Sequence, residues 1–206
     1  RPWEVEIMKM VLASKNTHKL MEMKAILGQL GVEVVLESDV GVDVDVEETG
    51  ETFEENAALK ARAVMEATGL PAIADDSGLC VAALGGGPGV YSARYGGEGL
   101  TDADRYQLVL DGLRGELDRS AKFVSCICCA FPGGDTITAR GECPGVITYA
   151  PRGEDGFGYD PVFFLPEYKK TFAQMTAEEK NAVSHRGRAL AKFKTELENY
   201  LHGTDQ

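Results

Sequence analysis

Apolar residues recur along the chain at two different spacings, which predicts a protein that contains both strands and helices. Mostly apolar runs at 7–13 and 32–36, each with a single charged residue, are typical of strands. From 20 to 30 the apolar positions instead follow a helical repeat, which ends at Gly31. Later helices are predicted where a Thr with an acidic residue three positions on forms a capping pattern, at Thr52, Thr101 and Thr176, and a last helix begins at, or is interrupted by, Ser184.

The remaining apolar segments predict strands. The segment 71–84 predicts two short strands interrupted by the polar residues 75–78, and Pro132-Gly133-Gly134 is typical of a hairpin turn between two long strands. Strands and helices interleave early and a hairpin comes late, which indicates an α/β domain with a mixed sheet. The other predicted strands are 121–131, 135–149 and 161–165.

The charge balance narrows the range of partners. Of 206 residues, 33 are acidic and 21 are Lys or Arg, so the formal net charge is −12. A surface this acidic repels nucleic acids and anionic membranes, and no apolar run approaches the roughly 18 residues of a membrane span. A small phosphate ligand remains compatible, because a few lysines and a divalent cation can bind it locally. We therefore expect a small-molecule partner, and neither nucleic acid nor membrane.

The cysteines favour a reducing compartment. Their number is odd, three lie in one apolar segment, and the paired CxxC knuckles of a zinc site are absent. Reduced thiols in the core of a cytoplasmic protein are therefore expected. The first eleven residues contain Glu4 and Glu6 and no apolar core, so they are not expected to be a signal peptide.

A first candidate for ligand binding is the polar segment 14–19, between the first strand and the first helix. Backbone N–H groups at a helix start favour an anion, and Lys19 adds a full positive charge. The spacing of a Walker loop is absent. The alternative is an ordinary helix cap, formed by Ser14, Asn16 or Thr17, beside a solvated lysine.

Adjacent carboxylates form the second candidate. Asp75 and Asp76 follow an apolar strand, where α/β sheets place ligands, and such carboxylates can hold Mg²⁺ or accept a proton from water. Glu48 could join them around a hard cation. Asn56 and Lys60 share a helix face and could contact the same phosphates. The alternatives are an Asp-rich turn and ordinary surface residues.

A third candidate combines aromatic rings with polar donors. In the segment 156–161 aromatics alternate with glycine, so Phe157 or Tyr159 could stack on a flat base while Asp160 accepts a base N–H. The alternative for this segment is an ordinary Tyr-Asp-Pro turn. Donors that could bind purine carbonyl oxygens follow at Lys180, His185 and Arg186, and the alternative for these is the polar start of a helix.

Six motifs occur in order along the chain: SKNTHK at 14–19, EETG at 47–50 with FEENA at 53–57, ADDSGL at 74–79, YSARY at 91–95, GFGYDP at 156–161 and SHRG at 184–187. In this order they resemble the inosine/xanthosine triphosphate pyrophosphatases, a family that hydrolyses non-standard purine nucleoside triphosphates. Ser14 stands where many members have Thr, which keeps the hydroxyl. Residues 1–7 lie outside the resemblance, and 8–203 is expected to be a single pyrophosphatase domain.

The resemblance implies an elongated mixed-sheet fold with two lobes and a central active-site cleft, and a homodimer. It implies that water attacks the α-phosphorus of ITP, dITP or XTP and releases the monophosphate and pyrophosphate. Mg²⁺ is the implied cofactor, held by Glu48 and Asp76. Asp76 is also the implied proton acceptor, and Asp75 is the alternative base or a second metal ligand. The implied substrate-binding residues are Ser14, Lys15, Asn16, Thr17, His18, Lys19, Asn56, Lys60, Ser77, Phe157, Gly158, Tyr159, Asp160, Lys180, His185 and Arg186.

Two other functions remain as alternatives. One is a different Mg²⁺-dependent nucleotide hydrolase, which removes the γ-phosphate or acts on a modified pyrimidine and is told apart by its products. The other is a nucleotide sensor without catalysis. The pair Asp75-Asp76 and Glu48 argue against a sensor, because binding alone does not need a carboxylate beside water.

Overall fold

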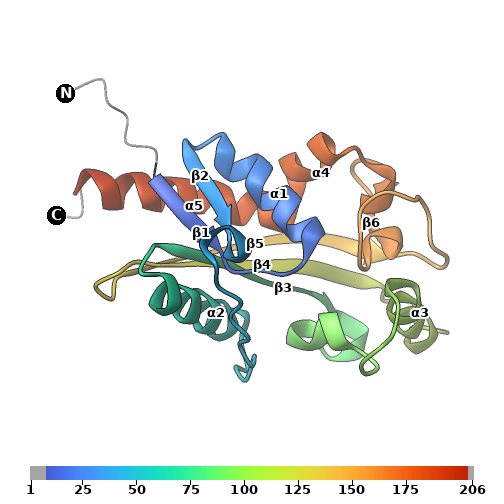
Figure 1. Ribbon diagram of the computed structural model, residues 1–206. Coiled ribbons are helices and arrows are strands. Elements are labelled where there is room, and N and C mark those ends of the chain that lie inside the picture. Colours follow the sequence, from blue (N-terminus) through green and yellow to red (C-terminus); the bar gives the residue numbers. More distant parts are fainter. Residues whose placement is uncertain (1–7, 204–206) are drawn as a thin grey trace. The chain divides into compact units, whose positions relative to one another are not determined.

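The structure is a computed structural model that describes residues 8–203, and it contains one open mixed sheet with helices (Figure 1). Its strands are β1 (Met8–Leu12), β2 (Val32–Leu36), β3 (Ala72–Val81), β4 (Ser120–Ala130), β5 (Thr136–Ile147), β6 (Phe163–Leu165) and β7 (Lys170–Thr171). They are hydrogen-bonded in the order β2-β1-β3-β4-β5-β6-β7. β1 is parallel to β2 and β3, whereas β6 is antiparallel to β5 and β7. The prediction of an α/β fold with a mixed sheet is confirmed.

The chain divides into two compact units. Unit 1 contains the described residues up to Asp76, then 126–140, then those from Ala189 onward; unit 2 contains 77–125 and 141–188. The predicted pair of lobes has its counterpart in these two units. Their boundaries fall inside β3, β4, β5 and α5 (His185–His202), so Asp76 and Ser77 are consecutive residues of one strand that belong to different units.

Unit 1 holds the parallel part of the sheet. Its helices are α1 (Thr17–Gly28), α2 (Phe53–Thr68) and most of α5 (His185–His202), and α1 and α2 lie on opposite sides of the sheet (Figure 1). The helical and strand spacings of the sequence place the apolar side chains of these elements in the core. Removing apolar surface from water lowers the free energy of the folded protein, so these side chains pack together. Fully buried members are Met10, Leu12, Met23, Leu27, Ile73, Ile127 and Phe193.

Unit 2 has an aromatic core. Its helices are α3 (Asp102–Gly112) and α4 (Ala177–Val183). Phe123 packs edge-to-face on Phe163, with ring centroids 4.5 Å apart, and stacks on Phe172 at 5.6 Å. These rings hold the segments that follow β5 against β4, and those segments carry the residues predicted to contact the base.

The capping patterns are confirmed in most details. The Thr101 side chain accepts from the Asp104 N–H while Asp104 accepts from the Thr101 N–H, and Thr176 does the same at the start of α4. Thr52 caps α2 by accepting from the Glu55 N–H. The predicted hairpin is present, because the Phe131 N–H donates to the Asp135 carbonyl across the turn at 2.9 Å.

The prediction of two strands interrupted at 75–78 is wrong. β3 continues from Ala72 to Val81 through both aspartates. A charged pair inside a buried strand is tolerated here because each carboxylate lies beside a lysine, so the backbone need not leave the sheet to solvate them. The strand predicted at 161–165 is shorter than expected, since residues 160–162 form a 3₁₀ turn before β6.

None of the five cysteines, all of which lie within residues 8–203, forms a disulfide, which agrees with the predicted reduced thiols. Cys126, Cys128, Cys129 and Cys143 are buried, and Cys80 is partly buried. Burial raises the pKa of the Cys143 thiol to about 11. Within residues 8–203 no helix is both long and apolar enough to cross a membrane.

Candidate active site

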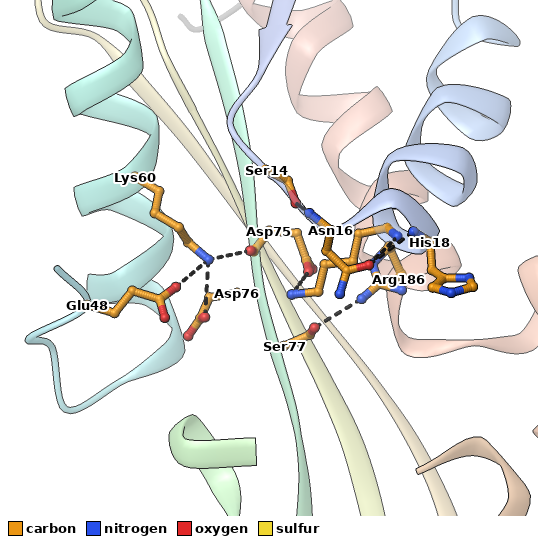
Figure 2. A network of polar contacts seen from close by, with 10 residues as sticks. Ser14, Asn16, His18, Glu48, Lys60, Asp75, Asp76, Ser77 and Arg186 are labelled. Atoms are coloured by element: carbon orange, nitrogen blue, oxygen red, sulfur yellow. Dashed lines mark hydrogen bonds and ion pairs between the residues drawn. The ribbon is translucent and has the colours of Figure 1, made fainter. Parts of the chain in front are cut away.

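The segment before α1 forms a helix cap. The Asn16 side-chain oxygen accepts from the N–H groups of His18 and Lys19 at 3.0 and 3.1 Å, and the Ser14 hydroxyl accepts from the Asn16 N–H at 3.2 Å (Figure 2). α1 itself begins at Thr17. The cap that we considered as the alternative is therefore present, with Asn16 as the capping residue. It fixes the direction of the first helical turn, which carries Lys19.

Two lysines of this segment face carboxylates of unit 1. The Lys19 ammonium lies 3.1 Å from the Asp75 carboxylate, which is fully buried. The Lys15 ammonium lies 2.6 Å from Asp43, and both of these side chains are largely exposed. Asp43 was not among the predicted site residues. It lies in an irregular segment of alternating Val and Asp, so the sequence alone does not bring it to Lys15.

The second lysine cluster centres on Lys60 of α2. Its ammonium lies 2.7 Å from Glu48 Oε1, 3.3 Å from Asp76 Oδ1 and 2.8 Å from the backbone carbonyl oxygen of Asp75 (Figure 2). Consecutive side chains of a strand point to opposite faces, so Asp75 contacts a lysine of α1 and Asp76 a lysine of α2. The structure thus separates two aspartates that are adjacent in the sequence.

Asp76 is the less compensated of the two aspartates. Its Oδ2 atom is buried and has no hydrogen-bond partner. Burial raises the pKa of Asp76 to about 6, with Glu48 and Asp75 adding to the effect and Lys60 and Lys19 opposing it. Burial acts to lower the pKa of Lys60, but Asp76 and Glu48 outweigh it, so this pKa lies above its usual value. At neutral pH the Asp76 carboxylate is therefore mostly ionised and lies beside the Lys60 ammonium.

Asn56 contacts the loop that carries Glu48. Its Oδ1 accepts from the Gly50 N–H at 2.8 Å and its Nδ2 donates to the Gly50 carbonyl at 3.3 Å. Asn56 is 1% exposed, and a Cβ on Gly50 would collide with its side chain. The predicted contact of Asn56 with phosphate stays a prediction. In the structure the Asn56 side chain holds the loop by two hydrogen bonds to Gly50, two residues after Glu48.

In unit 2 a buried ion pair closes the aromatic segment. Lys180 donates to Asp160 Oδ2 at 2.7 Å, and the same oxygen accepts from the Phe157 N–H at 3.0 Å. The Lys180 ammonium also lies 4.6 Å from the centre of the Phe157 ring, within the range of a cation–π contact. The Gly158 N–H donates to Asp102 Oδ2 at 2.9 Å, a partner that sequence reasoning missed. Phe157 is thus held beside a buried cation.

Arg186 contacts both Ser77 and the Phe157 ring. It is almost fully buried at the start of α5, its Nη2 donates to the Ser77 hydroxyl at 3.0 Å, and its guanidinium carbon lies 5.9 Å from the Phe157 ring centre (Figure 2). The junction of α4 and α5 aims this side chain. Ser184 ends α4 and accepts from the Gly187 N–H, and Gly187 passes so close to the Asn181 carbonyl that a Cβ would not fit.

Two predicted base contacts have other neighbours. The Tyr159 ring belongs to the core of unit 2, and its hydroxyl donates to the Ser92 carbonyl at 2.6 Å. The His185 ring stacks on Phe123, with centroids 4.6 Å apart. Of the predicted base residues, Lys180 and Arg186 lie beside the Phe157 ring, and Asp160 bonds both Lys180 and the Phe157 N–H.

A divalent cation fits the donor set of unit 1. No group of three or more His, Cys, Asp or Glu side chains arranged for a metal occurs among residues 8–203. Mg²⁺ needs fewer, because it commonly takes one or two carboxylates and completes its shell with water and phosphate oxygens. Glu48 and Asp76 supply these carboxylates, and the buried, unpartnered Asp76 Oδ2 is an acceptor of the kind that a cation would satisfy.

The fold is thus an open mixed α/β sheet that carries a buried aspartate pair beside two lysines in unit 1 and an aromatic ring beside two cations in unit 2. The chain belongs to the Ham1 family, whose model matches residues 10–196. The dITP/XTP pyrophosphatase of Shigella flexneri is 50% identical over 93% of this chain and 98% of its own, and that of Desulfotalea psychrophila is 48% identical over 95% and 88%. The Staphylococcus aureus Ham1 protein superposes with a TM-score of 0.84 at 43% identity, covering 93% of this chain and 99% of its own.

Proposed function

We propose that the protein hydrolyses non-standard purine nucleoside triphosphates, namely dITP, ITP and XTP, to the nucleoside monophosphate and pyrophosphate. Relatives that match almost end to end at about half identity carry the name dITP/XTP pyrophosphatase. The structural observation that carries the proposal is the Asp76 carboxylate, buried beside Glu48 and Lys60 with one oxygen unpartnered. Removing such triphosphates from the nucleotide pool is a house-cleaning activity.

In this proposal the phosphates bind in unit 1. Lys19 and Lys60 are cationic and lie beside carboxylates that phosphate oxygens can replace as partners. Positive groups placed where charge develops on phosphoryl oxygens stabilise the transition state more than the ground state. Lys15 is largely exposed, so it would mainly attract the negatively charged triphosphate as it approaches the protein.

Glu48 and Asp76 would hold Mg²⁺, which supplies Lewis-acid polarisation of the phosphate oxygens and neutralises charge when bound. The Asp76 carboxylate would also position the attacking water and take its proton. Its pKa, raised by burial to about 6, suits both tasks, because the group is ionised at pH 7 and above yet more basic than an ordinary aspartate. Both aspartates contact a lysine, but Asp76 keeps one buried oxygen without a hydrogen-bond partner, which favours Asp76 as the base.

The base would be recognised by residues of unit 2. Phe157 offers a ring for stacking, and Lys180 and Arg186 offer N–H donors beside that ring. A purine 6-carbonyl can accept from these donors, whereas the 6-amino group of adenine cannot. A buried donor that loses its acceptor is costly, which permits discrimination by orders of magnitude.

Product analysis tests this proposal. Purified protein is incubated with ITP, XTP, GTP and ATP, with Mg²⁺ and with EDTA, and pyrophosphate and phosphate are measured separately. We expect pyrophosphate and monophosphate from ITP and XTP, little from GTP or ATP, and none in EDTA. Release of inorganic phosphate, or equal use of all four nucleotides, contradicts the proposed reaction or its selectivity. Asp76→Asn should lower turnover by roughly 10²–10⁴-fold.

We also propose a cytoplasmic homodimer. The segment 85–99 supports an interface, because Val90, Tyr91 and Tyr95 gather apolar surface in one loop and Tyr91 is 55% exposed. Light scattering during gel filtration should give twice the 22.2 kDa mass of one chain. Tyr91→Asp should shift that mass toward the monomer, and Tyr149→Asp, at a tyrosine that is 77% exposed elsewhere, should not.

A further inference from the structure

The ammonium of Lys60 lies where three oxygen atoms converge. Two belong to the carboxylates of Glu48 and Asp76 and the third is the backbone carbonyl of Asp75, at distances of 2.7 to 3.3 Å from the nitrogen. The side chains of Lys60 and Asp76 are 17% and 7% exposed, so this arrangement is largely shielded from water. Carboxylate and carbonyl oxygens around one cation are also the ligands that Mg²⁺ and Mn²⁺ select.

The charges of this group are incompletely balanced. Glu48 and Asp76 contribute two negative charges and Lys60 one positive charge, so the trio has a net charge of −1, whereas a divalent cation between the carboxylates would neutralise them. Both cations cannot share the site, since like charges a few ångströms apart repel strongly when shielded from water. The lysine side chain has a flexible four-carbon stem and can move its charge to another partner.

From these contacts we propose that Lys60 is a place-holding cation, which a divalent metal displaces from Glu48 and Asp76 and which then becomes available to the substrate phosphates. The inference rests on the proposed metal site of the preceding section. Displacement couples the two ligands: metal frees the ammonium for phosphate, and phosphate draws the ammonium away from the carboxylates. By linkage each ligand raises the affinity for the other to the same degree.

Lys19 provides a matched comparison. It also pairs with a buried carboxylate of unit 1, but that carboxylate is Asp75, at 3.1 Å. Metal at Glu48 and Asp76 therefore has no need to displace Lys19. The Lys19 charge acts on Asp76 without pairing with it, so replacing Lys19 should strengthen metal binding only modestly. A place-holder competes directly with the metal before any nucleotide is present, so replacing Lys60 should strengthen metal binding more.

Metal binding without nucleotide tests the proposal. Mn²⁺ binding is measured by electron paramagnetic resonance for wild type, Lys60→Gln, Lys60→Arg and Lys19→Gln. We expect Lys60→Gln to bind Mn²⁺ roughly tenfold more tightly or better, because a competing charge is gone. Lys60→Arg keeps the charge and should resemble wild type. Lys19→Gln removes a charge that acts on Asp76 without pairing with it, so it should tighten Mn²⁺ binding less than Lys60→Gln does, and an equal effect of the two variants overturns the proposal. Unchanged or weaker binding by Lys60→Gln overturns the proposal.

Glu48→Gln and Asp76→Asn separate this proposal from the proposed function. If both abolish Mn²⁺ binding while Lys60→Gln leaves it unchanged, the metal site stands and the exchange is wrong. If neither wild type nor Lys60→Gln binds Mn²⁺, the metal site and the exchange are both wrong.

A second measurement uses the wild-type protein and does not depend on how a variant folds. An amine-acylating reagent is applied with and without Mg²⁺, and modification is read at each lysine by peptide mass spectrometry. We expect Mg²⁺ to raise the modification of Lys60 several-fold and to leave Lys19 unchanged. Equal modification of Lys60 in both conditions contradicts the exchange, and the Asp76→Asn protein should show no response to Mg²⁺.

Discussion

Replacing Asp76 by Asn should stabilise the ligand-free protein while it stops turnover. The fold holds this carboxylate in a buried position with one oxygen unpartnered. Burial raises its pKa from 3.8 to about 6, in spite of the nearby ammonium of Lys60. The folded protein therefore binds the Asp76 proton more tightly than the unfolded chain does, and ionisation of this group disfavours folding.

The magnitude follows from the pKa. A difference of about two units, at 1.36 kcal/mol each, corresponds to about 3 kcal/mol of unfolding free energy. This loss is absent below pH 4, develops as pH rises, and is complete above pH 6. Asparagine resembles the protonated carboxyl at every pH, so at pH 7.5 the variant should be more stable by up to about 3 kcal/mol. For a chain of this size that corresponds to a melting temperature higher by roughly 6–12 °C.

The assay is thermal and urea unfolding in EDTA at pH 4.5 and 7.5, for wild type, Asp76→Asn and Asp45→Asn. Asp45 is an exposed carboxylate of the same acidic segment, so its replacement should change little at either pH. The stabilisation by Asp76→Asn should be large at pH 7.5 and small at pH 4.5. A variant that is no more stable than wild type at pH 7.5, or equally stabilised at both values, refutes the reasoning.

Three further substitutions each test a contact within one of the two units. Lys180→Met leaves the Asp160 carboxylate buried without its ion pair and should lower the unfolding free energy by about 3–5 kcal/mol in urea titrations. Asn56→Ala removes both hydrogen bonds to the loop before α2; it should cost about 1–3 kcal/mol and raise the Mg²⁺ concentration needed for half-maximal turnover. Gly187→Ala should lower the melting temperature, because its methyl group meets the backbone of α4, whereas Gly28→Ala, which faces open space, should not.

Much of the fold could be predicted because local chemistry decides it. The strand at 32–36 and the helices after Thr101 and Thr176 follow from apolar spacing and from caps that need no distant partner. β3 could not be predicted as one strand, because what permits charges inside it is a pair of lysines on helices far away in the sequence.

The candidate site was predictable as a set of residues and less so as a set of contacts. The motifs named Lys19, Lys60 and Asp76, which the structure does place beside carboxylates or lysines. The motifs did not show that Asn56 forms hydrogen bonds with Gly50, or that the Tyr159 hydroxyl donates to a backbone carbonyl, since such partners depend on tertiary packing. Asp102 carried no signal beyond its place in the first turn of α3, where an acidic residue is common.

The two-residue repeat of β3 gives its aspartates their separate roles. Asp75 and Asp76 are chemically identical, and what distinguishes them is whether their position along the strand is odd or even. Inserting one residue between Ile73 and Asp75 would reverse the faces and offer each carboxylate the other's lysine, while inserting two would restore the faces. In this protein, therefore, the length of a buried strand is under chemical constraint as well as its composition, and a change by one residue there would alter the proposed reaction centre without replacing any of its side chains.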